Sequence, residues 1–300
     1  MHKLFTLTWN VTDSFSGSLL RDFLKRQHIS RAALTDIKFK GGCIEVNDEK
    51  VNVRYKLTTG DFVKVTFPLE YPSESLKPAC LPLDVIYEDD YLLVINKSAG
   101  MPSIPTREHL DDSLSNALLF YYEQNSIAST IHLVNRLDRD TSGLLIVAKY
   151  RHVHFLFSQA QEQRAIKRTY RALVHGTLSK KEGVINVPIG RKNGSIIERV
   201  VRSDGQYAVT HYKVIEEYDG FSEVDLQLDT GRTHQIRVHM EYVGNPLLGD
   251  SLYGGSRERI SRQALHSYKL TFFHPILQRE VSFQSPLPDD MQRLVQQSRG

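Results

Sequence analysis

Apolar and polar positions alternate along the first eleven residues and predict a β-strand at the start of the chain. Phe5, Leu7 and Trp9 fall on one side of this segment, and Thr6 and Thr8 fall on the other. A period of two is typical of a strand with one buried face, and the alternation differs from the continuous apolar core of a signal peptide. We therefore expect a folded N-terminal segment and no export signal.

Two short helices are predicted next, each with an apolar face and a basic face. The apolar positions within residues 19–24 and 33–37 are spaced for one helix face each, and Ser30 is the expected N-cap of the second helix. Alternating apolar residues at 44–46, 51–53 and 62–67 then predict strands. The expected unit is two helices packed on a small sheet, and the basic side chains on its helix faces are Arg21, Lys25, Arg26, Arg31, Lys38 and Lys40.

Proline interrupts the pattern between residues 68 and 82, at positions 68, 72, 78 and 82. Proline has no N–H group for a sheet ladder or a helix interior, so this stretch is predicted to be extended. We interpret residues 71–82 as a linker between an N-terminal domain of residues 1–70 and a second domain of residues 83–300.

The second domain has strand patterns interrupted by a few helices. Such an order indicates an α+β fold with a mixed, mostly antiparallel sheet rather than regular βαβ alternation. The expected elements are a hairpin at 85–95, strands at 144–148, 170–174, 210–214 and 224–228, and helices at 114–121, about 152–163 and 233–243.

Composition narrows the class of protein. With 40% hydrophobic and 24% charged residues, and no run of about 18 apolar residues, the chain is expected to be soluble and not to span a membrane. Two cysteines, Cys43 and Cys80, form no CxxC pair, so we expect a cytoplasmic protein. The net charge is +3, and residues 1–70 hold 11 Lys and Arg against 8 Asp and Glu. This excess is compatible with a polyanionic partner and equally with a merely soluble basic surface.

Residues 135–143 form a charged segment between two apolar strand patterns. Loops held by buried strands are common positions for functional residues. Asp138 lies between Arg136 and Arg139, so a neighbouring guanidinium could keep its carboxylate ionised. A turn carboxylate in a structural ion pair is the alternative interpretation.

A second charged segment, residues 229–240, joins a predicted strand to a predicted helix through Thr230–Gly231. The free N–H groups at a helix start, together with Arg232 and Arg237, would suit a phosphate or a carboxylate. The alternative is a helix whose arginines face water.

Metal and nucleotide sites are not indicated. His234 and His239 are five residues apart, which places them about 140° apart around a helix rather than on one face. Asp138 and Asp140 could form a magnesium pair, but the adjacent arginines disfavour it. The sequence has neither a GxxxxGK[ST] loop nor a GxGxxG motif.

Residues 135–145, NRLDRDTSGLL, closely resemble the HRLDxxTSGLL motif of the RluA-type pseudouridine synthases. The first 70 residues resemble an S4 RNA-binding domain through Ser30–Arg31, Gly41, Val46–Asn47 and Gly60–Asp61. Further segments resemble motifs of the synthase family in the same order: residues 96–102, 167–172, 230–239, 249–254, 264–266 and 273–275.

Three positions depart from the patterns of these families. Asn135 stands where the synthase motif has His, Ser98 replaces Pro in its NKPAG loop, and Asp48 replaces the Gly of the S4 turn. Because Asp138 is retained, we expect the chemistry to be unaffected and loop stiffness or RNA choice to differ.

The resemblance implies an enzyme that isomerises uridine in RNA. It implies that Asp138 acts at C1′ of the ribose and that Arg237 forms a salt bridge with Asp138. It also implies that Tyr170 stacks on the base and helps to remove the C5 proton, and that Arg136 fills the gap left by a flipped uridine. Arg139 and Arg232 are candidate RNA contacts. We expect a monomer that needs no cofactor or metal and acts on large-subunit ribosomal RNA, with transfer RNA as the alternative.

Two other classes of protein remain open from the sequence. A non-catalytic RNA-binding or ribosome-assembly factor would account for the S4-like region. A metal-dependent nuclease or a glycosidase would need a second positioned carboxylate, for which Asp140 and Asp250 are candidates.

Overall fold

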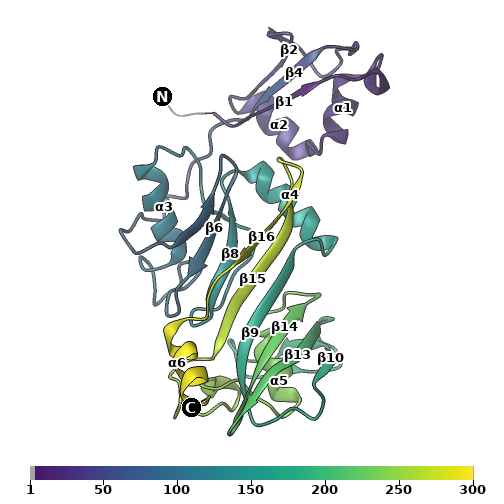
Figure 1. The fold of residues 1–300 in the computed structure, drawn as a ribbon. Helices are drawn as coiled ribbons and strands as arrows, with labels where there is room; N and C mark the ends of the chain where they lie inside the picture. Colours follow the sequence, from purple (N-terminus) through teal and green to yellow (C-terminus); the bar gives the residue numbers. More distant parts are fainter. Residues whose placement is uncertain (1–3, 300) are drawn as a thin grey trace.

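The N-terminal part of the chain forms a small antiparallel sheet covered by two helices (Figure 1). The computed structural model describes residues 4–299, so the first three residues of the predicted opening strand lie outside the described part. Ser30 Oγ accepts a hydrogen bond from Ala33 N, which confirms the predicted N-cap. The strand order is β1-β4-β2-β3, and the elements are β1 (Thr6–Asn10), α1 (Leu20–Arg26), α2 (Arg31–Phe39), β2 (Cys43–Val46), β3 (Glu49–Lys50) and β4 (Phe62–Thr66).

The strand predicted at residues 51–53 is wrong. The strand paired with β2 is limited to Glu49–Lys50, with one further bond from Val51 N to Ile44 O at 3.2 Å, and the chain then crosses to the start of α1. There, Val53 O and Tyr55 O accept hydrogen bonds from Arg21 N and Leu20 N, at 3.0 and 2.9 Å. The first N–H groups of a helix have no partner within the helix, so this segment caps α1 instead of extending the sheet.

The turn between β2 and β3 shows how the backbone accommodates Asp48. Asn47 and Asp48 have φ values of 52° and 65°, in the left-handed region. Asn and Asp adopt this region more readily than most other non-glycine residues. Asp48 can therefore replace the glycine that this turn commonly contains.

The rest of the chain is built on one large sheet, which is mostly antiparallel as predicted. Its main path is β10-β13-β14-β9-β15-β8-β6-β5, with β7 paired to β8 and β16 paired to β15, and only β8 and β15 run parallel among these described pairs. The strands are β5 (Val85–Glu88), β6 (Leu92–Lys97), β7 (His132–Leu133), β8 (Ser142–Ala148), β9 (Lys167–His175), β10 (Glu182–Asn186), β13 (Val209–Tyr218), β14 (Phe221–Leu228), β15 (Leu265–His274) and β16 (Arg279–Gln284), beside a separate hairpin of β11 (Ile189–Arg191) and β12 (Arg199–Val201).

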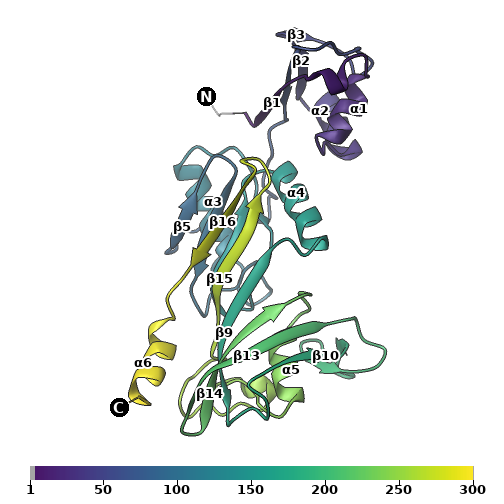
Figure 2. The same ribbon diagram turned by 45° about the vertical axis from the view of Figure 1, so that its right-hand side comes forward.

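Helices cover both faces of this sheet (Figures 1 and 2). Helices α3 (Leu114–Gln124) and α5 (Gln235–Tyr242) pack in one apolar cluster with strand residues such as Tyr170 and Leu145. The neighbouring strand residues point to the opposite face, where α4 (Arg151–Glu162) and α6 (Asp289–Gln297) pack. Short 3₁₀ helices occur at Asp13–Phe15 and Ser251–Tyr253.

Gly143 allows the close approach of β8 to β15. Its φ is +111°, and a Cβ atom added to it would lie 2.4 Å from the backbone oxygen of Ser267. Any other residue would therefore collide with β15. This contact explains the glycine that follows the charged loop in the sequence motif.

The two parts of the chain share an apolar junction. The ring of Phe5 stacks on Tyr150 with centroids 4.3 Å apart, and Phe67 stacks on His152 at 5.0 Å. Beyond β4, Glu70 accepts hydrogen bonds from His132 Nε2 at 2.5 Å and from the backbone N–H of Arg151 at 2.8 Å. The N-terminal sheet is therefore fixed to the region of α4, and one continuous core runs through both parts.

Residues 68–84 contain no helix or strand, yet hydrogen bonds attach them to α3. Asn116 Nδ2 donates to Lys77 O at 2.7 Å, and Ala79 N donates to Asn116 O at 3.1 Å. The proline-rich segment is therefore extended, as its composition predicts, and is bound to the start of α3.

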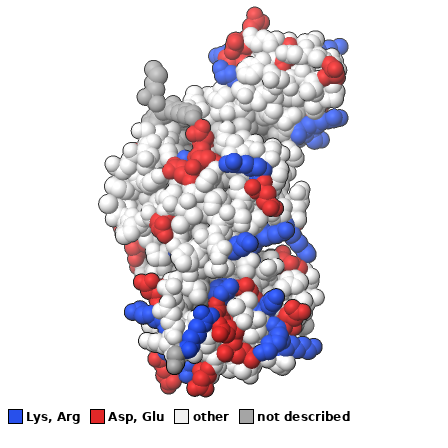
Figure 3. Space-filling model, in the orientation of Figure 1, with Lys and Arg blue, Asp and Glu red and all other residues white. Residues whose placement is uncertain are grey.

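Acidic and basic side chains are interspersed over the side of the molecule drawn in Figure 3. Within residues 4–299, no helix is both long and apolar enough to cross a membrane. The same described residues contain no group of three or more His, Cys, Asp or Glu side chains that could hold a metal ion.

Candidate active site

A large open cleft of about 1110 Å³ lies on the face of the sheet that α3 and α5 cover. The charged loop 135–141 forms one wall, and the turn 229–234 with the start of α5 forms another. The six basic residues predicted on the first two helices are exposed and lie in the N-terminal part of the chain, away from this lining. Six of the predicted site residues line the cleft: Arg136, Asp138, Arg139, Tyr170, Arg232 and Arg237.

Asp138 and Arg237 form the salt bridge that the family resemblance implies. Arg237 Nη1 donates to Asp138 Oδ2 at 3.2 Å, although 99 positions separate the two residues in sequence. The Asp138 side chain remains 30% exposed, so a ligand in the cleft can reach its carboxylate. Arg237 is only 8% exposed, which excludes the interpretation that this arginine faces water.

The two other carboxylates considered from the sequence are both engaged by arginines. Asp250 is 1% exposed and accepts hydrogen bonds from Arg237 Nε and Nη2 at 2.6 and 2.8 Å. Asp140 accepts from Arg139 Nε and Nη2 at 3.2 Å. With both oxygens of each group bound to a guanidinium, neither is placed as the free second carboxylate that a glycosidase pair requires.

The loop that carries Asp138 is fixed by buried hydrogen bonds that the sequence did not reveal. Lys97 Nζ donates to three carbonyl oxygens, those of Ser98, Met101 and Arg139, at 2.7, 2.8 and 2.9 Å. Burial lowers the pKa of Lys97 to about 7, against the effect of the nearby Asp140 and Asp138 charges. The bond to Ser98 uses its main-chain oxygen, which proline would also provide, so this bond does not require proline at the position.

Asn135 fills a structural position at the start of the same loop. Its side-chain oxygen accepts a hydrogen bond from Ile146 N at 3.1 Å, and only 7% of the residue is exposed. Its Nδ2 has no partner within the described residues. Asn135 therefore provides an acceptor for a main-chain N–H inside β8 and leaves one amide donor without a partner, among the described residues, in the wall of the cleft.

Tyr170 lies in the middle of β9, between β14 and β15, where it pairs in register with Leu226 and Ser267. It is 4% exposed and faces the cleft. Arg168 is two residues earlier, so it has the same facing, and its buried Nε has no partner within residues 4–299. The sequence offered no reason to separate Arg168 from its basic neighbours.

The turn before α5 is held by Gln235. Its side-chain oxygen accepts from Thr230 Oγ1 at 2.8 Å and from Arg232 N at 3.0 Å, and its Nε2 donates to Val209 O at 2.9 Å. These bonds hold the turn that precedes α5 and attach the first residue of the helix to β13. Arg232 is exposed at the cleft and donates from Nε to Tyr207 O at 3.0 Å.

The histidines of this segment have separate surroundings. His239 is fully buried between Thr210 Oγ1 at 2.8 Å and Val187 O at 3.1 Å, which is a structural role. His234 faces the cleft, with Nδ1 2.8 Å from the hydroxyl of Tyr253 and Nε2 3.9 Å from Asp138 Oδ2. The sequence suggested these histidines only as possible metal ligands, and the position of His234 beside Asp138 was not predicted.

Known proteins are similar in sequence to this chain over most of its length. The sequence profile described as RNA pseudouridylate synthase matches residues 91–242, a range that includes Asp138, Tyr170 and Arg237. The chain is 50% identical over 276 residues to the RNA pseudouridine synthase YjbO of Bacillus subtilis, covering 92% of this chain and 98% of that protein. It is 37% identical over 302 residues to ribosomal large subunit pseudouridine synthase D of Vibrio cholerae, covering 95% and 92%.

A solved structure gives the same result for the fold. The human RNA pseudouridylate synthase domain containing 1 aligns with a TM-score of 0.58 and 26% identity, over 74% of this chain and 96% of that chain. The interpretation as a non-catalytic RNA-binding factor is therefore wrong. The chain belongs to the RNA pseudouridylate synthase family, as an enzyme of the RluA type that isomerises uridine in RNA to pseudouridine.

Proposed function

We propose that Asp138 is the catalytic carboxylate and that the uridine binds in the cleft beside it. The observation that carries this proposal is the Asp138–Arg237 pair, at 3.2 Å, in the lining of a cleft whose volume of about 1110 Å³ is sufficient for a nucleotide. Arg237 is buried and always charged, so it holds and orients the carboxylate through a charge-assisted hydrogen bond. The exposed part of Asp138 is then free to meet the ribose.

The isomerisation breaks the bond between C1′ and N1, rotates the uracil, and joins C1′ to C5. A carboxylate near the anomeric carbon can serve this reaction by attacking C1′ or by taking a proton from the sugar. The C5 proton leaves when the new bond has formed, and N1 gains one, so the reaction consumes no co-reactant. We expect neither a metal ion nor a cofactor to take part.

Tyr170 and Arg136 are assigned to the base and to the gap it leaves. Tyr170 is held in β9 at the cleft wall, where its ring can stack on a flipped uracil and its hydroxyl can help to remove the C5 proton. Arg136 is exposed at the cleft, two residues before Asp138, and is placed to enter the space that a flipped uridine vacates. Arg139 and Arg232 are then contacts to the RNA backbone.

Replacement of Asp138 by Asn tests this assignment. We expect Asp138→Asn to abolish tritium release from RNA labelled at uridine C5, while RNA affinity and thermal stability stay near those of the parent enzyme. Asp140→Asn is the matched control, because Asp140 lies on the same loop with 31% of its side chain exposed, against 30% for Asp138. Tritium release by the Asp138→Asn variant would refute the assignment.

We further propose that the substrate is large-subunit ribosomal RNA and that the enzyme acts as a cytoplasmic monomer. The relative from Vibrio cholerae is named for the large ribosomal subunit, which supports this choice over transfer RNA. The S4-like N-terminal domain, with exposed basic faces on α1 and α2, is proposed to bind the same RNA.

Mapping pseudouridines in cells with and without the gene tests the substrate. Carbodiimide treatment followed by primer extension should reveal at least one large-subunit position that is modified only when the gene is present. A modification that disappears from transfer RNA alone would overturn this choice and leave the assignment of Asp138 intact.

A further inference from the structure

His234 and Arg237 approach the same oxygen of Asp138. Arg237 Nη1 lies 3.2 Å from Oδ2, and His234 Nε2 lies 3.9 Å from it. The other oxygen, Oδ1, is not engaged by either side chain. Oδ2 of Asp138 therefore has two neighbouring side-chain nitrogens, whereas Oδ1 is available to a ligand in the cleft.

The hydrogen bonds around Tyr253, together with the Asp138 carboxylate, favour one position for the proton of His234. The Tyr253 hydroxyl accepts a hydrogen bond from Arg199 N at 2.9 Å and lies 2.8 Å from His234 Nδ1. If this hydroxyl donates its proton to Nδ1, the neutral imidazole carries its own proton on Nε2. In the other tautomer, the lone pair of Nε2 would face the Asp138 carboxylate, which is repulsive. The geometry therefore favours an N–H group directed at Oδ2.

The backbone at His234 is held in an unfavourable conformation. Its φ and ψ are 58° and 20°, in the left-handed region, which costs on the order of 1 kcal/mol for a residue other than glycine. The neighbouring Gln235 fixes this turn through Thr230 and Arg232. Such strain persists where the surrounding structure imposes it, and here it places the imidazole between Tyr253 and Asp138.

The surroundings of His234 keep its ring neutral. Burial lowers the pKa of His234, as do the charges of Arg237 and Arg199, whereas Asp138 and Asp250 act in the opposite direction. The ring is 12% exposed, so it is shielded from bulk water but open to the cleft. A neutral donor at this position can orient a carboxylate without adding a second positive charge beside it.

We propose that His234 is a positioning residue, which donates from Nε2 to Asp138 Oδ2 in the RNA-bound enzyme and so directs Oδ1 at the ribose, with Tyr253 fixing the required tautomer. This inference rests on the proposed role of Asp138. It assigns a function to two residues, from two separate sequence segments, that the isomerisation chemistry itself does not require.

Two substitutions at position 234 separate the donor from the backbone. Asn adopts the left-handed region readily, but its side chain is too short to reach Asp138, whereas the amide of Gln can take the place of Nε2–H. Because a hydrogen bond to a charged group is at stake, we expect His234→Asn to lower kcat about 10- to 100-fold with little change in KM. His234→Gln should recover most of this loss. Equal activity of the His234→Asn variant and the parent would overturn the proposal.

Tyr253→Phe provides a second test that does not depend on how well the variants at 234 fold. The substitution keeps the ring under Arg237, whose guanidinium carbon lies 4.9 Å from the ring centroid, and removes only the hydroxyl. It should lower kcat in the parent enzyme and cost little further in the His234→Gln background, because a Gln amide has no tautomer to fix. Equal losses in both backgrounds would contradict the tautomer argument.

The Asp138→Asn variant distinguishes a failure of the role proposed for His234 from a failure of the proposed function. If the Asp138→Asn variant is inactive and the variants at 234 and 253 behave like the parent, only the role of His234 fails. If the Asp138→Asn variant is active, the proposed function itself fails, whatever the variants at 234 do.

Discussion

Arg237 donates two hydrogen bonds to Asp250, of 2.6 and 2.8 Å, and holds it more closely than it holds Asp138 at 3.2 Å. Asp250 is almost completely buried, whereas Asp138 is partly open to the cleft. The arginine is therefore anchored by one carboxylate and presents its remaining Nη1 to the other. This arrangement makes Asp250 responsible for the position of Arg237.

Substitution Asp250→Asn should reduce both stability and activity. Loss of one partner of a buried ion pair leaves Arg237 poorly compensated, so we expect the free energy of unfolding to fall by about 3 kcal/mol. The released guanidinium can also turn towards Asp138 and displace it, so kcat should fall about 100-fold. Urea unfolding and tritium release measure the two effects.

Asp290→Asn is the matched control for this substitution. Asp290 binds Arg262 through hydrogen bonds of the same lengths, 2.6 and 2.8 Å, but lies on α6, on the other face of the sheet, with 33% of its side chain exposed. The Asp290→Asn variant should lose less stability and a smaller part of its kcat, because Arg262 touches the Asp138 loop only through the main-chain oxygen of Asp140, at 3.0 Å. If both variants keep full activity, Asp250 does not position Arg237 for the reaction.

Substitution Tyr170→Phe separates stacking from proton transfer. The ring stays in the cleft wall, so RNA affinity should be preserved, while product formation should fall because the hydroxyl near C5 is lost. Filter binding and tritium release together measure the difference. A Phe variant with the parent rate would reduce Tyr170 to a stacking or packing residue.

The local parts of the fold could be predicted from the sequence, because they depend on neighbouring residues. Hydrophobic spacing and the Ser30 cap predicted α2, and the hairpin of β5 and β6 followed from two apolar segments on either side of an acidic turn. The strand at 51–53 was mispredicted because the first N–H groups of α1, which is distant in sequence, donate to the carbonyl groups of Val53 and Tyr55. Local propensity contains no information about such a partner.

In the candidate site, too, local motifs could be predicted from the sequence, and contacts between distant segments could not. Asp138 and Arg237 could be selected from their motifs, but spacing alone could not show that Asp250 and Tyr253 hold Arg237 and His234 in place. Lys97 was missed because a buried lysine bound to three carbonyl groups has the same sequence pattern as a lysine at the end of an exposed strand. These contacts depend on how segments far apart in the chain pack together.

The stability of the enzyme should fall in acid through Asp89, at the turn of the β5–β6 hairpin. Burial alone raises the pKa of Asp89, but hydrogen bonds from His274 Nε2 and from the backbone N–H groups of Tyr91 and Leu92 outweigh it and lower the pKa to about 2. His274 Nδ1 accepts from Ile276 N and Leu277 N, so the proton lies on Nε2.

A depressed pKa stabilises the folded protein above the unfolded value of 3.8, and this contribution is lost as the pH falls towards 2. We expect up to about 2 kcal/mol from this group, measured as the free energy of urea unfolding between pH 5 and pH 2. Asp89→Asn should be less stable at neutral pH and should lose less on acidification. An identical pH dependence of the variant and the parent would contradict this role of Asp89.

The basic faces of α1 and α2 should contribute to RNA affinity and not to the chemical step. Deletion of the N-terminal domain is a poor test, because it would expose Tyr150 and His152, on which Phe5 and Phe67 stack. Substitution by Gln leaves this junction intact. The residues to replace are the exposed Arg21, Lys25, Arg26, Arg31, Lys38 and Lys40.

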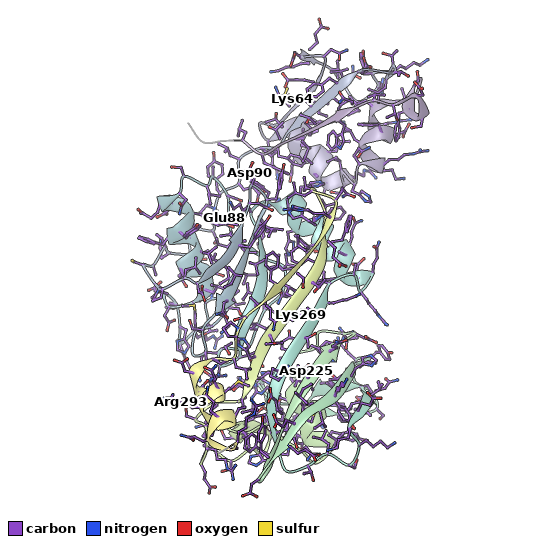
Figure 4. All side chains as sticks on the ribbon, viewed as in Figure 1. Lys64, Glu88, Asp90, Asp225, Lys269 and Arg293 are labelled. Carbon is purple, nitrogen blue, oxygen red and sulfur yellow. The ribbon has the colours of Figure 1, made fainter. Side chains whose placement is uncertain are left out.

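The substituted enzyme should bind structured RNA more weakly, with the parent kcat at saturating RNA. Each lost phosphate contact should make the plot of log affinity against log salt shallower by about 0.7–0.9, because fewer counterions are released. Lys269→Gln with Arg293→Gln is the control, since both residues are exposed and lie on β15 and on α6, away from the cleft lining (Figure 4). An unchanged salt dependence in the sixfold variant would mean that these helix faces do not contact RNA, and the affinity would then have to come from the arginines of the cleft alone.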